Sequence, residues 1–430
     1  MMQRLRGNTR YPFLIIILVL GATLRFWNLG KTNFWADEDM SVATQYRSVS
    51  EIIDERVRRS PLINIEPPGY HILNKAAQWI VPTPIDAFEG RWGRFGLRLL
   101  SAFAGIFSVF FMFQLAASFC GREKAWAPAA LMSCSFYAVY YSQENRPYSL
   151  VAALTLLSTW LFVEAFFKGR RALAAPYAIS IAALCYMHYT AILAPLIHLT
   201  AFVAVWVLKA DMPEDDLSIR RIEKRDVMAF GLAGLGALIL FAPWLQHTFS
   251  ISVNPADYFS SARTTAETFP YLNFNLSVST LAHFGCGGWL SVFTYGPMAA
   301  LGIFSVWKKN KSLGILAISF YLLPLIFLTF NSHSRYIQPR YLMVIFPMHQ
   351  LLAGVGVLES AQLISKWSRR IPRITLSEKR LRRLVLVAIF TFLIAMNLSA
   401  LGPYYARGIK CSSENFIEQK FCREYLLYME

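Results

Sequence analysis

The sequence contains few charged residues for its length. Of its 430 residues, 16% are Asp, Glu, Lys or Arg, whereas 55% are hydrophobic. A soluble chain normally carries about 25% charged residues. The hydrophobic residues here also occur in runs long enough to cross a hydrocarbon layer about 30 Å thick. The composition therefore excludes an ordinary soluble protein and predicts an integral membrane protein.

Cysteine is also scarce, and the six cysteines show no metal-ligand spacing. Four of them lie in or beside hydrophobic runs, where a free thiol behaves as a small hydrophobic side chain. These are Cys120, Cys134, Cys185 and Cys286. Cys411 and Cys422 lie in a polar C-terminal segment, and a disulfide between them requires an oxidising compartment. We predict this disulfide; the alternative is that both thiols remain free.

Other features that would indicate different functions are missing. The sequence has no pair of matching interrupted hydrophobic segments in two halves, which would indicate a transporter. Acidic or basic residues deep inside hydrophobic runs would indicate a proton path. His198 and His349 do fall in the middle of runs, where we expect them to make core hydrogen bonds. Arg25, Arg98, Glu164 and Glu359 all lie near the ends of such runs. No basic groove with interleaved aromatic residues is present, so we expect no nucleic-acid partner.

Eleven hydrophobic runs are present, and we expect each to form a membrane-spanning helix. They cover residues 11–29, 95–119, 125–141, 149–167, 172–188, 190–208, 227–246, 284–307, 313–330, 341–362 and 384–402. The polar connections between them alternate in charge, and every second connection is rich in Lys and Arg. By the positive-inside rule, this pattern places the N-terminus in the cytoplasm and the C-terminus outside. The net charge of +16 is then an orientation signal and an attraction to anionic lipids.

This topology predicts an all-α polytopic fold in four parts. They are a cytoplasmic N-terminus with the first span (1–29), an outer loop (30–94), the other ten spans (95–402) and an outer tail (403–430). In the outer loop, apolar residues recur at helical spacing from Val42 to Val57, which predicts an amphipathic helix over 40–58 on the membrane surface. Pro67 and Pro68 end that pattern, and a second, shorter helix is expected over 70–81.

Five polar stretches lie on the outer side in this topology, each close to a hydrophobic boundary. They are Asp37-Glu38-Asp39, IEPPGYH (65–71), SQENRPYS (142–149), MHYT (187–190) and NSHSRYIQPRYL (331–342). Together they supply the carboxylates, arginines, tyrosines and histidines that a site for a phosphorylated amphiphile needs. A carboxylate can accept a proton from an attacking hydroxyl, and arginine presents a rigid fork of donors to phosphate oxygens.

The three consecutive acids have two interpretations. In the first, a carboxylate of this stretch faces a lipid-borne substrate and acts as a catalytic base. In the second, Asp39 is the N-cap of the following helix, and Asp37 and Glu38 are favoured there by the helix dipole.

The other polar stretches also have structural alternatives. Arg335 and Arg340 are placed where snorkelling anchors occur. Glu144 and Arg146 are close enough in sequence to pair across a turn. His188 fits an interfacial histidine whose hydrogen bonds are satisfied locally. The residues alone leave these alternatives open.

Taken in order, several segments resemble the GT-C superfamily of integral-membrane glycosyltransferases. The segments are W-x-D-E after the first run, PPGYHILNK, RFGLRLLSAFAGIFSVFFMFQLA, YYSQENRPYSLVAALTLLS, MHYTAILAPL and QPRYLMVIFP. Within that superfamily, they are similar to the protein O-mannosyltransferase and aminoarabinose transferase type. The resemblance covers most of the chain and is strongest in residues 11–205 and 335–350.

The resemblance implies a sugar donor on a polyprenyl phosphate and a catalytic acid in the first outer loop. By position, Asp37 matches this acid, with Glu38 beside it. The segment Glu144–Tyr148 matches the second outer motif of the family, and Arg340-Tyr341 matches its late Arg-Tyr pair. Two features depart from the family pattern. Ile65-Glu66 stands where many relatives have Asp-His or Glu-Lys, and the large soluble C-terminal domain of some branches has no counterpart in this sequence.

We therefore expect an enzyme that transfers a monosaccharide, a hexose or a pentose, from polyprenyl phosphate to an acceptor hydroxyl. The acceptor is a protein, lipid or glycan, and the site faces the outer side of a bacterial or archaeal plasma membrane. Asp37 is the expected base, with Glu38 as its catalytic neighbour, and one displacement predicts inversion at the sugar. Arginines are expected to bind the donor phosphate. They are Arg146, Arg335 and Arg340.

Further candidate site residues are Glu66, Tyr70, Glu144, Tyr148, His188, Tyr189 and Tyr341. Glu38, Glu66 and His188 are candidates for holding a divalent cation, since oxygen and imidazole ligands suit such ions. One alternative function is a carrier or flippase for a lipid-linked sugar, which would use the same arginines without needing a base. A third is a structural subunit of a membrane assembly, which would depend on no single outer carboxylate.

Overall fold

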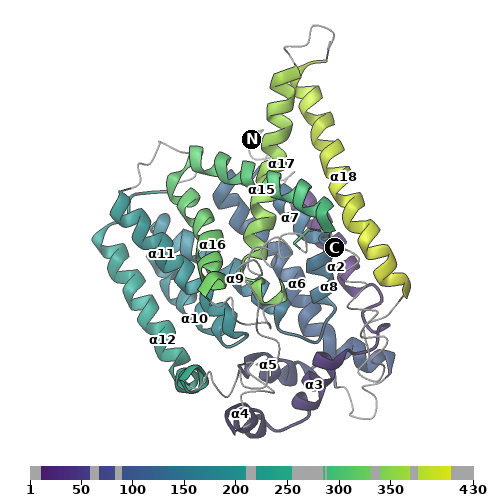
Figure 1. Cartoon of the computed structure of the whole chain (residues 1–430), viewed down its shortest axis with the longest axis vertical. Helices are drawn as coiled ribbons and strands as arrows, with labels where there is room; N and C mark the ends of the chain where they lie inside the picture. Colours follow the sequence, from purple (N-terminus) through teal and green to yellow (C-terminus); the bar gives the residue numbers. More distant parts are fainter. Residues whose placement is uncertain are drawn as a thin grey trace, which may run out of the picture.

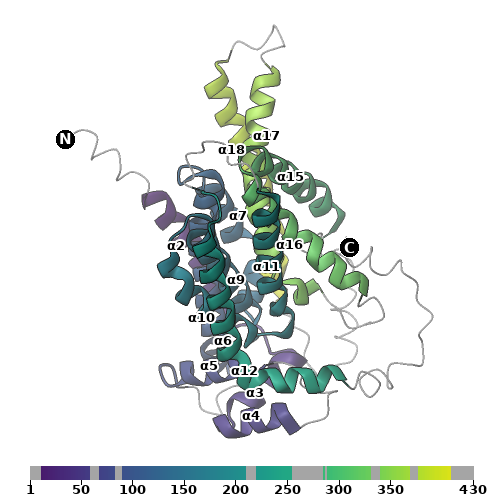
Figure 2. The ribbon, with the colours of Figure 1, turned by 90° about the vertical axis from the view of Figure 1, so that its left-hand side faces the viewer.

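The computed structural model describes residues 11–58, 67–82, 90–209, 219–253, 284–285, 288–330, 339–368 and 376–407. All regular secondary structure in these ranges is helical, which confirms the all-α prediction. The helices form an elongated bundle (Figure 1). Three short helices, α3 (Ala36–Gln45), α4 (Val49–Arg58) and α5 (Gly69–Gln78), lie together at one end of it. At the opposite end, α17 (Phe346–Ser368) and α18 (Glu378–Arg407) extend side by side beyond the other helices (Figure 2).

Helices cover the hydrophobic runs of the sequence. Six segments in the described ranges are long and apolar enough to cross a membrane. They include α6 (Arg91–Cys120), α9 (Tyr148–Phe162), α11 (Leu193–Leu208), α12 (Lys224–Val253), α15 (Gly288–Lys309) and α18. Shorter apolar helices are α2 (Tyr11–Phe26), α10 (Ala174–Cys185) and α16 (Lys311–Phe330). The chain is thus a multi-pass membrane protein, while the count of eleven spans stays a prediction.

The run over 125–141, expected as one helix, is divided into α7 (Trp126–Cys134) and α8 (Phe136–Ser142). The break falls at Ser135, whose backbone leaves the helical region with ψ of 123°. Its side-chain oxygen accepts a hydrogen bond from the backbone N–H of Ala138 and so caps α8. Hydrophobicity continues across this break, and therefore does not reveal it.

Small residues allow α17 to pack closely against its neighbours. A Cβ atom at Gly356 would overlap the carbonyl oxygen of Met298 on α15, and one at Gly302 would overlap that of Leu352 on α17. Close approach of backbones at small residues is typical of helix packing in membranes, where van der Waals contact rather than the hydrophobic effect holds helices together.

The prediction of one amphipathic helix over 40–58 is wrong. The chain forms α3 and α4 instead, and α4 begins with a capping box. The hydroxyl of Ser48 accepts from the N–H of Glu51 (3.2 Å), and the Glu51 carboxylate accepts from the N–H of Ser48 (2.7 Å). The buried apolar residues are Val42 and Ile52, whereas Ile53 is exposed. The second expected helix, over 70–81, is observed as α5.

Asp39 is not an N-cap, so that part of the structural alternative for the acidic stretch is wrong. Helix α3 starts at Ala36, with Trp35 in the N-cap position. Asp37, Glu38 and Asp39 all lie in its first turn, where the helix dipole favours negative charge.

Candidate functional site

The consecutive acids Asp37 and Glu38 have different surroundings. The Glu38 side chain is completely buried, whereas that of Asp37 is 20% exposed. Because successive helical residues point about 100° apart, one side chain of α3 faces the bundle while its neighbour faces the rim of the site. Of these two carboxylates, only that of Asp37 is partly exposed.

Glu38 is held by a buried arginine from α6. Arg98 donates through Nε to Oε1 of Glu38 (2.8 Å) and through Nη2 to Oε2 (2.9 Å). The backbone N–H of Asn145 adds a third hydrogen bond to Oε1 (2.7 Å). Arg98 also donates through Nη1 to the carbonyl oxygens of Leu29 and Thr32. A buried charge is tolerated when it is paired and hydrogen-bonded in this way.

Arg98 is absent from the site residues that the sequence indicates. Its position near the start of a hydrophobic run is the signal, since a charged residue there needs a partner. The identity of that partner depends on how α3 folds back over α6, which no local pattern reveals.

Asp37 pairs with Arg340, which lies in a 3-10 turn (Pro339–Leu342) just before α17. Arg340 Nη2 lies 2.9 Å from Asp37 Oδ2. Its guanidinium carbon lies 4.8 Å from the ring centroid of Trp35, 5.4 Å from that of Tyr341 and 5.9 Å from that of Tyr148. These distances are typical of cation–π contacts. Two parts of the chain that are distant in sequence therefore meet in an ion pair, which is surrounded by three aromatic side chains.

The surroundings of Arg340 favour its charged form. Burial alone would lower the pKa of this guanidinium, but the neighbouring Tyr148 and Asp37 raise it, and the net shift is upward. Arg340 is therefore a permanent cation. It lies next to the partly exposed carboxylate of Asp37.

Arg146 belongs to the same cluster. Its Nη1 donates to the hydroxyl of Ser41 (3.0 Å) and to the backbone carbonyl of Asp37 (3.3 Å). Its guanidinium carbon lies 5.8 Å from the ring centroid of Tyr148. Glu144 is buried in the same loop between α8 and α9. Both predicted residues thus lie at the site.

Asn145 links the surface helices to this loop. Its side-chain oxygen accepts hydrogen bonds from the hydroxyl of Tyr70 (2.8 Å), from Nδ2 of Asn74 (2.5 Å) and from Nε2 of Gln45 (2.9 Å). Tyr70, a predicted site residue, is therefore part of the support beneath the site. Asn145 and Asn74 lie in segments that the sequence analysis singles out, but neither they nor Gln45 were candidate site residues, because their neutral amides carry no sign of what they contact.

His188 and Tyr341 also meet at the site. Their rings stack with centroids 5.4 Å apart, and the ring of Tyr148 lies 5.8 Å from that of His188. His188 Nδ1 lies 2.8 Å from the hydroxyl of Thr190. Tyr189 is half-buried at the start of the 3-10 turn Tyr189–Ile192. The aromatic residues of three predicted stretches thus form one wall.

Two predicted site residues, Glu66 and Arg335, lie outside the described residues, as do Cys411 and Cys422. Within the described ranges, no group of three His, Cys, Asp or Glu side chains could hold a metal ion. Glu38, a candidate ligand, uses both carboxylate oxygens for Arg98. The described part of the chain therefore does not assemble the expected cation site.

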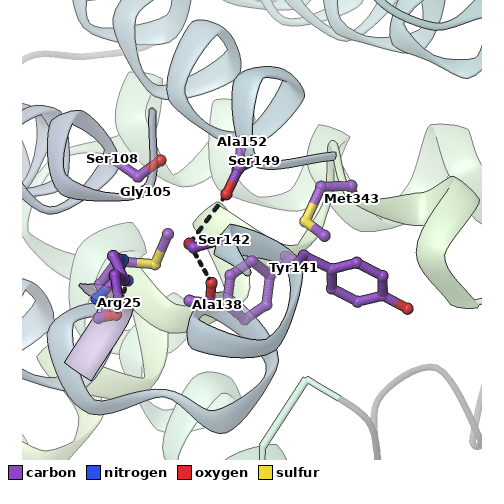
Figure 3. A pocket seen from close by; sticks show the side chains of 11 residues that line it. Arg25, Gly105, Ser108, Ala138, Tyr141, Ser142, Ser149, Ala152 and Met343 are labelled. Carbon is purple, nitrogen blue, oxygen red and sulfur yellow. Dashed lines mark hydrogen bonds between the residues drawn. The ribbon is translucent and has the colours of Figure 1, made fainter. Parts of the chain in front are cut away.

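A small cavity lies between residues of α2, α6, α8 and α9 (Figure 3). Its lining includes Arg25 of α2, Gly105 and Ser108 of α6, and Ser142 and Ser149, which flank the loop. The hydroxyls of Ser142 and Ser149 lie 3.0 Å apart. Arg25 is fully buried and donates to the carbonyl oxygens of Gly21, Met132 and Ser133.

The fold is similar to those of solved membrane glycosyltransferases. ArnT from Cupriavidus metallidurans in the apo state matches with a TM-score of 0.60 at 13% identity, over 93% of this chain and 77% of that chain. The same protein bound to undecaprenyl phosphate matches with a TM-score of 0.57 at 14% identity, over 92% and 78%.

A third similar structure is the archaeal oligosaccharyltransferase AglB from Archaeoglobus fulgidus, in complex with an inhibitory peptide and a dolichol-phosphate. It matches with a TM-score of 0.58 at 13% identity, over 98% of this chain and 60% of that chain, so this chain spans less than two thirds of AglB. No family model and no curated protein sequence matches the chain. This chain shares the fold of these solved glycosyltransferases, which confirms the resemblance in fold that the sequence predicted.

Proposed function

We propose that this chain is a membrane glycosyltransferase that takes a monosaccharide from a polyprenyl-phosphate donor and transfers it to an acceptor hydroxyl. The observation that carries the proposal is the pairing of the partly exposed Asp37 carboxylate with Arg340. This pair places a proton acceptor next to a fixed cation at one end of a membrane bundle. Support also comes from the fold, which is shared with proteins solved with undecaprenyl phosphate and dolichol-phosphate.

In the proposed reaction, the acceptor hydroxyl attacks the anomeric carbon of the sugar. A new C–O bond forms, the proton passes to the Asp37 carboxylate, and the bond between the anomeric carbon and the phosphate oxygen breaks. The phosphate leaves with the bonding electrons, and one displacement inverts the sugar. Arg340 and Arg146 would offset the charge that grows on the phosphate. A phosphate is a good leaving group, so the reaction needs no separate acid.

We assign Glu38 a positioning role rather than that of a second base. Its carboxylate accepts three hydrogen bonds from Arg98 and Asn145 and is fully buried. A group so enclosed cannot reach an acceptor hydroxyl, but it fixes the first turn of α3 and hence the position of Asp37. This arrangement supports Asp37 as a single catalytic base whose position is fixed by the Glu38–Arg98 ion pair.

We place the site on the outer face of the plasma membrane of a bacterium or archaeon. Helix α9 begins at Tyr148, in the site, and its helical path continues to Phe167. The basic segment Lys168–Arg171 follows at its far end. The tip formed by α17 and α18, with the basic residues at the start of α18, also lies at the end away from α3 (Figure 1). By the positive-inside rule, these basic ends face the cytoplasm.

The test compares Asp37→Asn with Asp39→Asn, a neighbouring acid of the same helical turn. Asn keeps the shape of Asp37 but cannot accept the proton, so sugar transfer by the purified protein should fall about 10²–10⁴-fold. Binding of the donor lipid should persist, because Arg340 and Arg146 remain. Asp39→Asn should transfer nearly normally. Near-normal transfer by Asp37→Asn would refute Asp37 as the base. Donor binding without any sugar transfer by the purified wild-type protein would favour a carrier, which needs no proton acceptor.

A further inference from the structure

Two buried N–H donors beside the Asp37–Arg340 pair have no hydrogen-bond partner in the described part of the chain. They are Nε1 of Trp35 and Nε of Arg340. The two residues are in contact, because the guanidinium carbon of Arg340 lies 4.8 Å from the ring centroid of Trp35. Arg340 meanwhile uses Nη2 for Asp37. The unused donors therefore belong to one cluster at the site.

Unused donors of this kind require an explanation. Most buried polar groups in native proteins are hydrogen-bonded, since an N–H group withdrawn from water without an acceptor destabilises the fold. Here the exposed fraction of the Arg340 side chain is only 13%, which limits what bulk water can supply. A ligand that supplies the missing acceptors would remove this cost at the site.

The chemistry of the two donors defines the missing partner. The indole N–H and the guanidinium only donate hydrogen bonds and never accept them. A matching group must therefore present acceptor oxygens, and beside a permanent cation it is most stable when negatively charged. A phosphate monoester or diester meets both conditions. A sugar hydroxyl or an amide meets only the first.

We propose that Trp35 Nε1 and Arg340 Nε both donate to the phosphate of the lipid-linked donor, which makes Trp35 a specificity-determining residue for that group. The inference rests on the proposed function and extends it to a residue with no titratable group. It gives the indole of Trp35 two functions. The face of the Trp35 ring holds the guanidinium, and its edge binds the phosphate.

The test separates the N–H from the ring. Trp35→Phe keeps an aromatic face beneath Arg340 and removes the donor. Trp27→Phe, at a tryptophan that is 59% exposed near the end of α2, is the matched control. Purified proteins are titrated with undecaprenyl phosphate, with undecaprenol, which lacks the phosphate, and with inorganic phosphate.

We expect wild type and Trp27→Phe to bind undecaprenyl phosphate well above undecaprenol. Trp35→Phe should lose about tenfold in affinity for the phosphate lipid, as for one hydrogen bond to a charged group, and nothing for undecaprenol. Equal affinities of Trp35→Phe and wild type for the phosphate lipid would overturn the inference. A Trp35 effect seen only with inorganic phosphate would also overturn it, because the ligand would then be a free ion.

Two controls keep the result interpretable. If Trp35→Phe does not fold, β-(3-benzothienyl)alanine at position 35 replaces the N–H by sulfur in a ring of the same shape, and the same affinities decide. If wild type itself binds undecaprenyl phosphate no better than undecaprenol, the proposed function fails. That outcome is distinct from failure of the Trp35 assignment, in which wild type binds and the variant binds equally well.

Discussion

Glu38 and Arg98 form a fully buried two-point ion pair that joins the surface helix α3 to the membrane helix α6. Glu38 follows Asp37 directly in the sequence, so any movement of the ion pair would also move the proposed base. Ion pairs in such surroundings gain little net stability compared with apolar residues, because both charges lose water. We infer that this one is retained because it fixes geometry at the site.

Removing one partner of this pair should destabilise the protein strongly. Glu38→Gln leaves the charge of Arg98 buried without its counter-ion, which costs about 3–5 kcal/mol. We expect a clear fall in the melting temperature of the detergent-solubilised protein. Glu123→Gln, at an exposed glutamate between α6 and α7, is the control and should melt like wild type. An unchanged melting temperature in Glu38→Gln would contradict the structural role.

Arg340→Lys should weaken binding of the donor lipid although it keeps the positive charge. Lysine lacks the planar fork that can serve Asp37 and a phosphate together, and it lacks the Nε donor. We expect a loss of about tenfold in affinity for undecaprenyl phosphate, measured by titration of the purified protein, which corresponds to one charge-assisted hydrogen bond. If the lysine variant binds as tightly as wild type, charge alone is enough and the fork has no role.

Gly105→Ala should disturb the support of the loop between α8 and α9. A Cβ atom at this position would lie 2.6 Å from Nε of Arg25 and would overlap the hydroxyl of Ser142. Overpacking of this kind typically costs about 1–3 kcal/mol, which thermal melting can resolve. Gly234→Ala on α12 is the matched control, since a Cβ atom there meets nothing within 4 Å. Equal melting temperatures of the two variants would show that the loop between α8 and α9 accommodates the added methyl group without loss of stability.

The proposed orientation can be tested with two single cysteines in a background without native cysteines. Position 51 on α4 lies at the end of the bundle with the site, and position 308 lies in the last turn of α15. Both side chains are exposed. An impermeant thiol reagent should label Glu51→Cys in intact cells and reach Lys308→Cys only after lysis. Labelling of both positions in intact cells would rule out the topology.

The helical architecture could be predicted from the sequence because the length of a hydrophobic run is a local property. The helices α6 and α9 can be predicted from their hydrophobic runs without knowing what these helices contact. Breaks are harder, since α7 and α8 are separated by a single residue, Ser135, within continuous hydrophobicity. The boundary between α3 and α4 did carry a signal, the Ser48-x-x-Glu51 capping box, which the helical spacing of apolar residues obscured.

The site was accessible only in part, for a physical reason. Asp37 and Arg340 stand out because charge is rare in this chain and both adjoin hydrophobic runs. The pairing of Glu38 with Arg98, and the hydrogen bonds on Asn145, arise from tertiary packing between elements far apart in sequence. Trp35 was visible in the sequence as an aromatic residue, but its significance comes from an N–H whose surroundings only the folded chain defines.

The buried Arg25 has a consequence for how the protein is made. Its guanidinium is satisfied by one carbonyl of its own helix and by those of Met132 and Ser133, which are synthesised more than a hundred residues later. When α2 first leaves the ribosome, this charge has no such acceptors in the lipid, where it is costly. The first helix should thus remain with the insertion machinery until α7 emerges, so that a ribosome-stalled chain ending before residue 126 still crosslinks to the translocon through α2, whereas one that exposes α7 is released.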